Sequence, residues 1–305
     1  MMKWMQVSLT ALLLSALAIP AMAQETTEDA RTVMLKESFK AGHSRTETAE
    51  ESNTTEVSAQ EMVVQTETST ETETKITDVL EVNEKGKITK ARIRWTEGTT
   101  TTEKVELGKE PEDAVTVDSE LTGATILYTW NAEKKAWEAK LEEGDADLDD
   151  VKKQMKKTDP FVNPFVPDRE VKIGESWDAD AEGLKALFSG DEGIKLKAVT
   201  ATCKAEEIVT EKEMEYLKVS IELTMTGELQ DENIGKPEIT ATRKGHYLYD
   251  IAEGRIVSIE LDSEGSFDAE VQTPQGKMAL TVGIAGNEKR AITYGETEAK
   301  EDEDK

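Results

Sequence analysis

Alternation of apolar and polar residues with a period of two dominates the second half of the chain. The clearest run is 217–225, in which Leu217, Val219, Ile221, Leu223 and Met225 alternate with Lys218, Ser220, Glu222 and Thr224. This pattern is typical of a β-strand with one buried face. The run 199–205 has the same form, with Val199, Ala201, Cys203 and Ala205 on one face.

Short polar segments separate such runs and predict hairpins. Turn-forming residues occur at 83–86, 131–134, 250–254 and 274–276, each between two β-patterned runs. In the first hairpin Ala91, Ile93 and Trp95 share a face, and in the second Ile126, Tyr128 and Trp130 do. Consecutive hairpins with one apolar face predict an antiparallel meander.

The N-terminal part of the chain is more polar. Val33, Leu35 and Phe39 fall on one face of a strand, and residues 40–43 predict a turn into a polar return strand. At 66–74, threonine at every second position alternates mainly with glutamate. High polarity is typical of disorder, but β-branched threonine at period two favours a solvated strand.

The middle of the chain interrupts the β pattern. Acidic residues followed by lysines at 145–157 predict a short helix, because this charge order suits the helix dipole, and Pro160 would end it. Prolines at 160, 164 and 167 exclude a regular helix or central strand in the following stretch. We then expect a short strand at Val171 and Ile173 leading into the C-terminal sheet, a core anchor at Trp177 and a second helix over 180–188.

These patterns predict a mainly β fold: long antiparallel meander sheets, forming a half-barrel or two packed β halves, with one or two short helices inserted in the middle. The expected organisation is a signal peptide (1–23), a disordered segment (24–31), an N-terminal antiparallel β half (32–144), a helical and Pro-rich connection (145–193), a C-terminal β meander (194–295) and a disordered acidic tail (296–305).

The first 23 residues have the features of a secretory signal peptide. Lys3 precedes a short apolar core, Pro20 follows it, and Ala21-Met22-Ala23 forms an A-x-A cleavage site. The apolar core is shorter than the roughly 20 residues of a membrane span. We therefore expect cleavage after Ala23, a secreted protein in the periplasm or the medium, and no membrane span.

The composition of the chain disfavours some classes of binding partner. The formal net charge is −27, which opposes binding to nucleic-acid backbones and anionic membrane surfaces. Hydrophobic residues make up 37% and aromatic residues 5% of the chain, so a thick multilayer core is not expected. With a single cysteine, Cys203, no intramolecular disulfide can form, and its place on an apolar strand face favours a buried thiol over a nucleophile.

The sequence assigns no catalytic, cofactor-binding or metal-binding residue. Asp145, Asp147 and Asp149 resemble the opening of a calcium loop, but Asp150 stands where that loop needs glycine and Lys156 where it needs glutamate. His43 and His246 lie in no nucleophile or metal motif, and His246 has the opposite strand parity to Tyr247. No Gly-rich phosphate loop is present, so we expect no cofactor.

Three stretches resemble an uncharacterised family of secreted bacterial β-rich proteins, a domain of unknown function. They are LKESFKAGHS (35–44), VPDREVKIGESW (166–177) and GHYLYDIAEGRIVSIELD (245–262). The resemblance implies an extended antiparallel sheet and transfers no catalytic residues. More distantly, the order of elements is similar to periplasmic lipoprotein-carrier half-barrels, which is a likeness of architecture alone.

The leading functional hypothesis is a secreted, non-catalytic β-sheet protein that binds a lipid or other apolar ligand on a concave face, or serves as an envelope scaffold with an envelope protein as partner. That face could instead be filled by the protein's own core. One alternative is an extracellular carboxylate-dependent hydrolase, which needs two acids about 5–9.5 Å apart in a cleft. Another is an interaction module that pairs through the Thr/Glu strand by β-augmentation.

Overall fold

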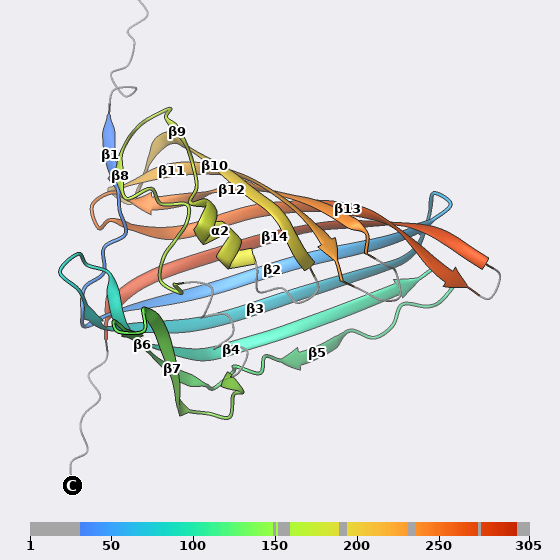
Figure 1. The fold of residues 1–305 in the computed structure, drawn as a ribbon, viewed down its shortest axis with the longest axis horizontal. Coiled ribbons are helices and arrows are strands. Elements are labelled where there is room, and N and C mark those ends of the chain that lie inside the picture. Colours follow the sequence, from blue (N-terminus) through green and yellow to red (C-terminus); the bar gives the residue numbers. More distant parts are fainter. Residues whose placement is uncertain are drawn as a thin grey trace, which may run out of the picture.

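The computed structural model describes residues 31–148, 151, 159–188, 194–230, 236–273 and 276–297. Its strands form a 12-stranded antiparallel sheet and a separate two-stranded sheet (Figure 1). The large sheet contains β2 (His43–Ala59), β3 (Met62–Val82), β4 (Ile88–Glu106), β5 (Val115–Asp118), β6 (Thr125–Asn131), β7 (Ala136–Glu143), β9 (Ser176–Asp178), β10 (Ile194–Glu211), β11 (Met214–Leu229), β12 (Glu238–Asp250), β13 (Arg255–Thr273) and β14 (Gly276–Glu296). The predicted mainly β meander is confirmed.

Two meanders join into one continuous sheet through the first and last long strands. The strand order is β7-β6-β4-β3-β2-β14-β13-β12-β11-β10-β9, with β5 also paired to β4. β2 and β14 are antiparallel from the pair His43–Glu296 to the pair Ser58–Thr281. Of the two architectures left open by the sequence, the structure therefore has the open, curved sheet and not two separately packed halves.

The predicted strand at 32–35 forms, but with an unexpected partner. β1 (Thr32–Leu35) pairs with β8 (Arg169–Lys172) in the two-stranded sheet, and β2 does not pair with β1. The expected hairpin between them is therefore wrong, as is the expectation that β8 begins the C-terminal sheet. That edge is formed by β9, where Trp177 pairs with Cys203 of β10. The pairing of β1 with β8 buries Val33, Leu35 and Val171 in one apolar core. The sequence pattern did not predict it, because alternation fixes which face of a strand is buried but not which strand it pairs with.

Asparagine and aspartate side chains close three of the hairpin turns. Asn83 Oδ1 accepts hydrogen bonds from the backbone N–H of Lys85 and Lys87. Asn131 and Asp250 each accept two such bonds from residues two and three positions further along. These side chains satisfy backbone donors that would otherwise face solvent in the turn, and they hold the register of β3–β4, β6–β7 and β12–β13.

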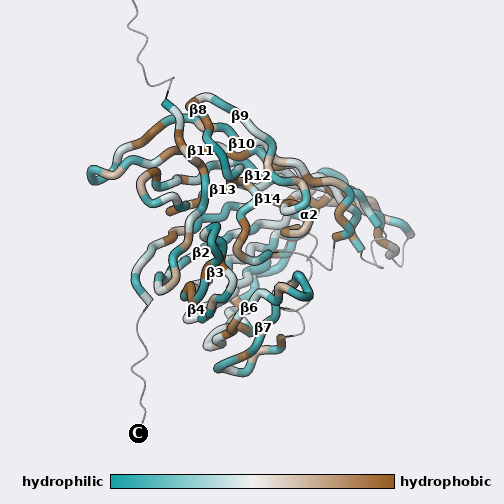
Figure 2. The backbone as a smooth tube through the Cα atoms, turned by 60° about the vertical axis from the view of Figure 1, so that its left-hand side comes forward, coloured by the Kyte–Doolittle hydropathy of each residue, from teal (hydrophilic) through white to brown (hydrophobic). Residues whose placement is uncertain are grey.

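The middle of the chain crosses the concave side of the sheet (Figure 1). The predicted second helix is confirmed as α2 (Ala181–Phe188), and Asp180 caps it by accepting hydrogen bonds from the backbone N–H of Glu182 and Gly183. Figure 2 shows the sheet curving around α2, with β8–β10 and β6–β7 on opposite sides. We call residues 160–165 together with α2 the cover.

The cover connects two separate apolar cores. The first lies between α2, β1, β8 and β9–β13 and includes Trp177, Leu217 and Tyr247. The second lies on β3, β4, β6 and β7 and includes Trp95, Ile126 and Trp137. Phe161 packs edge-on against Tyr128 and Trp137 in the second core, with ring centroids 5.9 and 4.9 Å away.

Phe165 carries the cover into the first core. Its backbone carbonyl accepts hydrogen bonds from Trp177 Nε1 at 3.2 Å and Tyr247 Oη at 3.4 Å. The predicted core position of Trp177 is thereby confirmed. The Pro-rich stretch is thus a bridge between the two cores, since it contacts one with Phe161 and the other with Phe165.

The Thr/Glu run lies within β3 and is a strand, as predicted. β3 is paired on both sides, with β2 and with β4, so its backbone edge is not free for another chain. β-Augmentation through this strand is therefore wrong as a hypothesis. Within the described ranges, no helix has both the length and the apolar composition needed to cross a membrane.

Several predicted boundaries fall outside the described residues. The signal peptide (1–23), residues 24–30, and residues 149, 150 and 152–157 of the helix predicted over 145–157 lie there. Arg31, placed in the expected disordered segment, is described and pairs with Glu215. β14 continues through Glu296, which we expected to begin the acidic tail, and Thr297 N donates to Gly42 O; residues 298–305 are not described.

Candidate functional site

A cavity of about 360 Å³ lies between the concave face of the sheet and the cover. Its apolar wall comes from alternate residues of β11 and β13, namely Ile221, Leu223, Ile259 and Leu261. Ile221 and Leu223 are two residues apart on β11, and Ile259 and Leu261 are two apart on β13, so each pair lies on one face of its strand. Both pairs lie on the same face of the sheet, because Ile221 and Leu261 are each paired with Gly245 of β12. Phe165 and Phe188 of the cover line the opposite side.

A larger cavity of about 860 Å³ lies on the other side of the cover, against β3, β4 and β6. Val79, Ile93, Trp95 and Tyr128 contribute its apolar wall. Arg45, Glu47 and Arg290 line both cavities. Charged side chains therefore separate the two apolar regions of the concave face.

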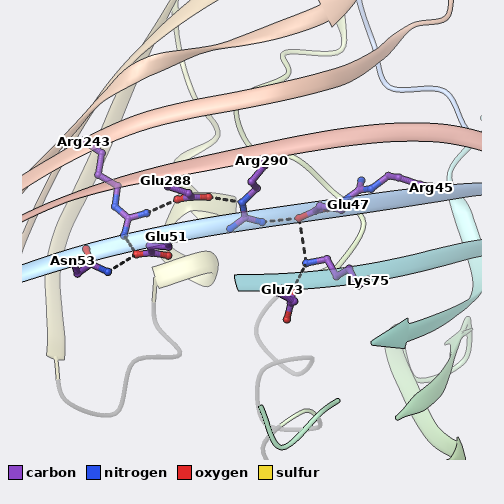
Figure 3. Close-up of polar contacts among 9 residues, drawn as sticks. All are labelled: Arg45, Glu47, Glu51, Asn53, Glu73, Lys75, Arg243, Glu288 and Arg290. Atoms are coloured by element: carbon purple, nitrogen blue, oxygen red, sulfur yellow. Dashed lines mark hydrogen bonds and ion pairs between the residues drawn. The ribbon is translucent and has the colours of Figure 1, made fainter. Parts of the chain in front are cut away.

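These charges belong to an ionic row that crosses β3, β2, β14 and β12 (Figure 3). The row consists of Arg45, Glu47, Glu51, Glu73, Lys75, Arg243, Glu288 and Arg290. Acids and bases alternate along it, so each cation contacts at least one carboxylate. Four cations and four carboxylates give the row no formal net charge.

Glu47 is the centre of the row and is almost fully buried, with its side chain 3% exposed. Its Oε1 accepts from Arg290 Nη1 at 2.8 Å and lies 3.2 Å from Lys75 Nζ. Its Oε2 accepts from Arg45 Nη2. Glu47 thus binds one cation from each of three places: its own strand, β3 and β14.

The row extends from Glu47 in both directions. Lys75 Nζ donates to Glu73 Oε1 at 3.1 Å, and Trp95 Nε1 donates to Glu73 Oε2 at 3.1 Å. On the other side, Glu288 accepts from Arg290 Nε and from Arg243 Nη1, the latter at 3.0 Å. The row therefore ties the N-terminal meander to the C-terminal one where β2 and β14 pair.

Electrostatics at the centre follow from burial and cations acting in opposite directions. Burial alone would raise the pKa of Glu47, but Arg45, Lys75 and Arg290 together lower it to about 2. Burial would lower the pKa of Arg290, and the Glu288 and Glu47 carboxylates raise it instead. Burial would likewise lower the pKa of Arg45, and the Glu47 carboxylate is the main cause that raises it instead. All three groups are charged at neutral pH.

Glu37 is a third carboxyl group in the smaller cavity and differs from Glu47 and Glu288. No hydrogen bond or ion pair joins its side chain to another residue of the described chain. Burial raises its pKa to about 6, with Arg45 lowering and Glu47 further raising it. The cavity thus holds two carboxylates bound by cations and one without such a partner.

This distribution of carboxylates bears on the hydrolase hypothesis. Glycoside hydrolysis by two carboxyl groups needs one as acid and another free to act as base or nucleophile. Both oxygens of Glu47 and both oxygens of Glu288 already bind cations. The smaller cavity therefore presents binding groups on an apolar wall and lacks an available carboxyl pair.

The residues weighed from the sequence do not gather at this site. Cys203 is buried in the first core, and burial raises the pKa of its thiol to about 12, as expected of an inert cysteine. His246 and Tyr247 occupy opposite faces of β12, and His43 lies at the start of β2. Among the described residues, no group of three or more histidine, cysteine, aspartate or glutamate side chains is placed to hold a metal ion.

Sequence reasoning missed the ionic row. A usable signal was present, because three strands each carry an acid and a base two positions apart: Arg45 with Glu47, Glu73 with Lys75, and Glu288 with Arg290. Residues two apart share a strand face. Their alignment across β3, β2 and β14 depends on the β2–β14 register, which the sequence pattern does not specify.

No family model matches the chain, and no curated protein matches it. The resemblance to a family of secreted bacterial proteins therefore stays a prediction. Among solved structures, one of lipovitellin described by its lipid–protein interactions is similar with a TM-score of 0.47 and 11% identity, covering 86% of this chain and 26% of that chain. An outer membrane channel from Pseudomonas putida F1 gives a TM-score of 0.19 and 8% identity over 85% of this chain and 98% of that one. The chain thus spans about a quarter of the lipovitellin chain.

Proposed function

We propose that this protein is a non-catalytic binding protein that holds an apolar or amphipathic molecule between its curved sheet and the cover. The observation that carries the proposal is the smaller cavity, whose apolar wall and charged row face the same space. Its volume of about 360 Å³ falls within the roughly 300–1,000 Å³ typical of small-molecule sites.

The arrangement of polar groups supports binding. Ligand sites combine a mostly apolar lining with a few fixed polar groups that orient the ligand. Here Ile221, Leu223, Ile259 and Leu261 supply the apolar surface, and the arginines of the ionic row supply hydrogen-bond donors held by carboxylates. Side chains fixed in this way lose little freedom when a ligand binds.

A secreted location forms part of the proposal and rests on the signal-peptide pattern of residues 1–23. Expression of the full chain in a bacterial host, followed by fractionation and N-terminal sequencing, tests it. We expect a mature chain that begins at Gln24 in the periplasm or the medium. An uncleaved chain retained in the cytoplasm would contradict this part.

The binding proposal is tested by native mass spectrometry of the purified protein for bound lipid, together with titration of a fluorescent fatty acid. Ile259→Trp should fill the cavity and abolish uptake, because Ile259 lines it directly. Glu260→Trp is the matched control, since Glu260 is exposed on the opposite face of the same strand. Failure to find bound lipid or uptake in the unmodified protein, or equal uptake by both variants, would overturn the proposal.

A further inference from the structure

The guanidinium of Arg45 has unused hydrogen-bonding capacity at the wall of the smaller cavity. Its Nη2 donates to Glu47, but its Nε is buried from solvent and has no hydrogen-bond partner in the described chain. Glu47 is the acceptor that Arg45 shares with Lys75 and Arg290. Nε itself is closed to a ligand, but the Arg45 side chain is 28% exposed and no hydrogen bond in the described chain uses its Nη1. A ligand acceptor would therefore bind at the exposed part of this guanidinium, which carries donors that the protein leaves unpaired.

Glu37 does not supply that acceptor through a hydrogen bond or ion pair. Its carboxyl lines the same cavity and faces Arg45 and Glu47 of β2. Three tyrosines on other strands also face it: the charge of Glu37 helps to raise the pKa of Tyr294 on β14 and of Tyr247 and Tyr249 on β12. Desolvation keeps its pKa near 6, so this carboxyl takes up a proton more readily than an ordinary glutamate.

The remaining wall determines the rest of the ligand. Ile221, Leu223, Ile259 and Leu261 require an apolar portion, which a small polar anion lacks. A ligand that satisfies Arg45 and covers this wall must carry a hydrogen-bond acceptor at one end and a hydrocarbon chain at the other.

We propose that the cavity takes a single-chain amphiphile with a carboxylate head, which binds at Arg45 while its hydrocarbon chain lies along β11 and β13. This inference rests on the proposed function and adds the chemical class of the ligand. A carboxylate matches the planar fork of a guanidinium. A doubly charged phosphate head is disfavoured more than a singly charged carboxylate, because Glu37 lines the same cavity without a cation bound to it.

Binding of a carboxylate head at Arg45 should depend on pH. A carboxylate head beside Glu37 places two acids near each other, which favours the protonated form of Glu37. Binding then takes up a proton at neutral pH, and affinity should rise as pH falls from about 8 to about 6. Glu37→Gln removes the second acid, so it should bind more tightly than the unmodified protein at about pH 8 and with a weaker pH dependence.

The test compares binding of dodecanoate, dodecanol and dodecyl phosphate to the full-length purified protein by displacement of a fluorescent fatty acid. We expect dodecanoate to bind at least about tenfold more tightly than dodecanol, and Arg45→Gln to lose this preference. Lys289→Gln is the matched control, because Lys289 is an exposed cation on β14 and should keep the preference.

The outcomes separate the two proposals. Equal affinity for dodecanoate and dodecanol would overturn the headgroup assignment and leave a binding cavity, whereas absence of binding by all three compounds would overturn both. Tighter binding of dodecyl phosphate than of dodecanoate would also overturn the assignment. If Arg45→Gln does not fold, Glu37→Gln still decides, because an unchanged pH dependence in that variant contradicts a carboxylate beside Glu37.

Discussion

Arg290 Nη1, on the last strand of the chain, donates to Glu47 Oε1, on the first long strand of the chain, across 2.8 Å. The two side chains come from strands at opposite ends of the sequence, and their contact lies where the two meanders join. Since Glu47 also contacts Arg45 and Lys75, one buried carboxylate binds three cations at this junction.

Replacing Glu47 by glutamine should therefore destabilise the fold strongly. The substitution keeps the shape of the side chain but leaves three cations without their shared carboxylate. Breaking a buried ion pair in this way costs about 3–5 kcal/mol, measured as the free energy of unfolding in urea. Glu50→Gln is the control, because Glu50 is exposed on the other face of the same strand, and a change within about 0.5 kcal/mol is expected there. Equal losses in both variants would contradict a special role for Glu47.

Glu37 gives the stability a pH dependence of defined sign. Burial raises its pKa from an ordinary 4.5 to about 6 in the folded protein. The folded state therefore binds the proton more tightly than the unfolded state. The resulting stabilisation is complete below the ordinary pKa and is lost as pH rises through about 6.

The measurement compares the melting temperatures of the unmodified protein and Glu37→Gln between about pH 5 and about pH 7. The variant should gain stability relative to the unmodified protein as pH rises from 4.5 to about 6, and the difference should level off above that range. The comparison cancels the general effect of the large negative charge, which both proteins share. A difference that does not vary with pH would show that Glu37 titrates normally.

Glu47 should act in the opposite direction at lower pH. Its pKa is lowered from 4.5 to about 2, because Arg45, Lys75 and Arg290 outweigh the effect of burial. The stabilisation it provides is present above 4.5 and is lost as pH falls toward about 2. Glu47→Gln should therefore be less sensitive to acid than the unmodified protein over this range, which acid titration followed by circular dichroism would measure.

Much of the fold follows from local pattern. Alternation at 217–225 places Leu217 and Leu223 on a buried face of β11, and the turn residues Asn83, Asn131 and Asp250 mark hairpins that form as expected. Such signals are local, since side-chain direction and turn geometry depend on neighbouring residues.

The partners of distant strands were not predictable in this way. The buried faces of β1 and β8 could be recognised at Val33 and Val171, but not their pairing. Likewise, the register of β2 with β14 is visible only in the folded chain. The ionic row depends on that register. In the sequence Glu47 is therefore indistinguishable from the many other acidic residues, although it is 2% exposed in the structure.

Trp177 provides a test of the bridge between the cover and the first core. Its indole is 7% exposed and donates to the Phe165 carbonyl at 3.2 Å. Trp177→Ala should cost about 3–5 kcal/mol of unfolding free energy, because it leaves a cavity in the core. Trp177→Phe should cost less, since it keeps most of the apolar volume and loses the hydrogen bond. An unchanged melting temperature in Trp177→Ala would refute this role.

Two glycines of the same sheet provide a matched pair. A Cβ added at Gly245 of β12 would lie 1.9 Å from Glu260 O and 2.8 Å from Leu261 Cα, both backbone atoms of the neighbouring strand β13. Backbone atoms held in a sheet cannot move aside as a flexible side chain can. Gly245→Ala should therefore force β12 and β13 apart and cost at least about 1–3 kcal/mol.

Gly283 of β14 is the opposite case. An added Cβ there meets no atom within 4 Å, and the residue does not have a positive φ. Gly283→Ala should leave the free energy of unfolding unchanged or raise it by about 0.4–1 kcal/mol, because alanine restricts the unfolded chain. Urea unfolding of both variants measures the contrast. Destabilisation of similar size at the two positions would mean that loss of glycine itself matters, whereas a loss confined to Gly245 would locate the constraint in the close approach of β12 to β13.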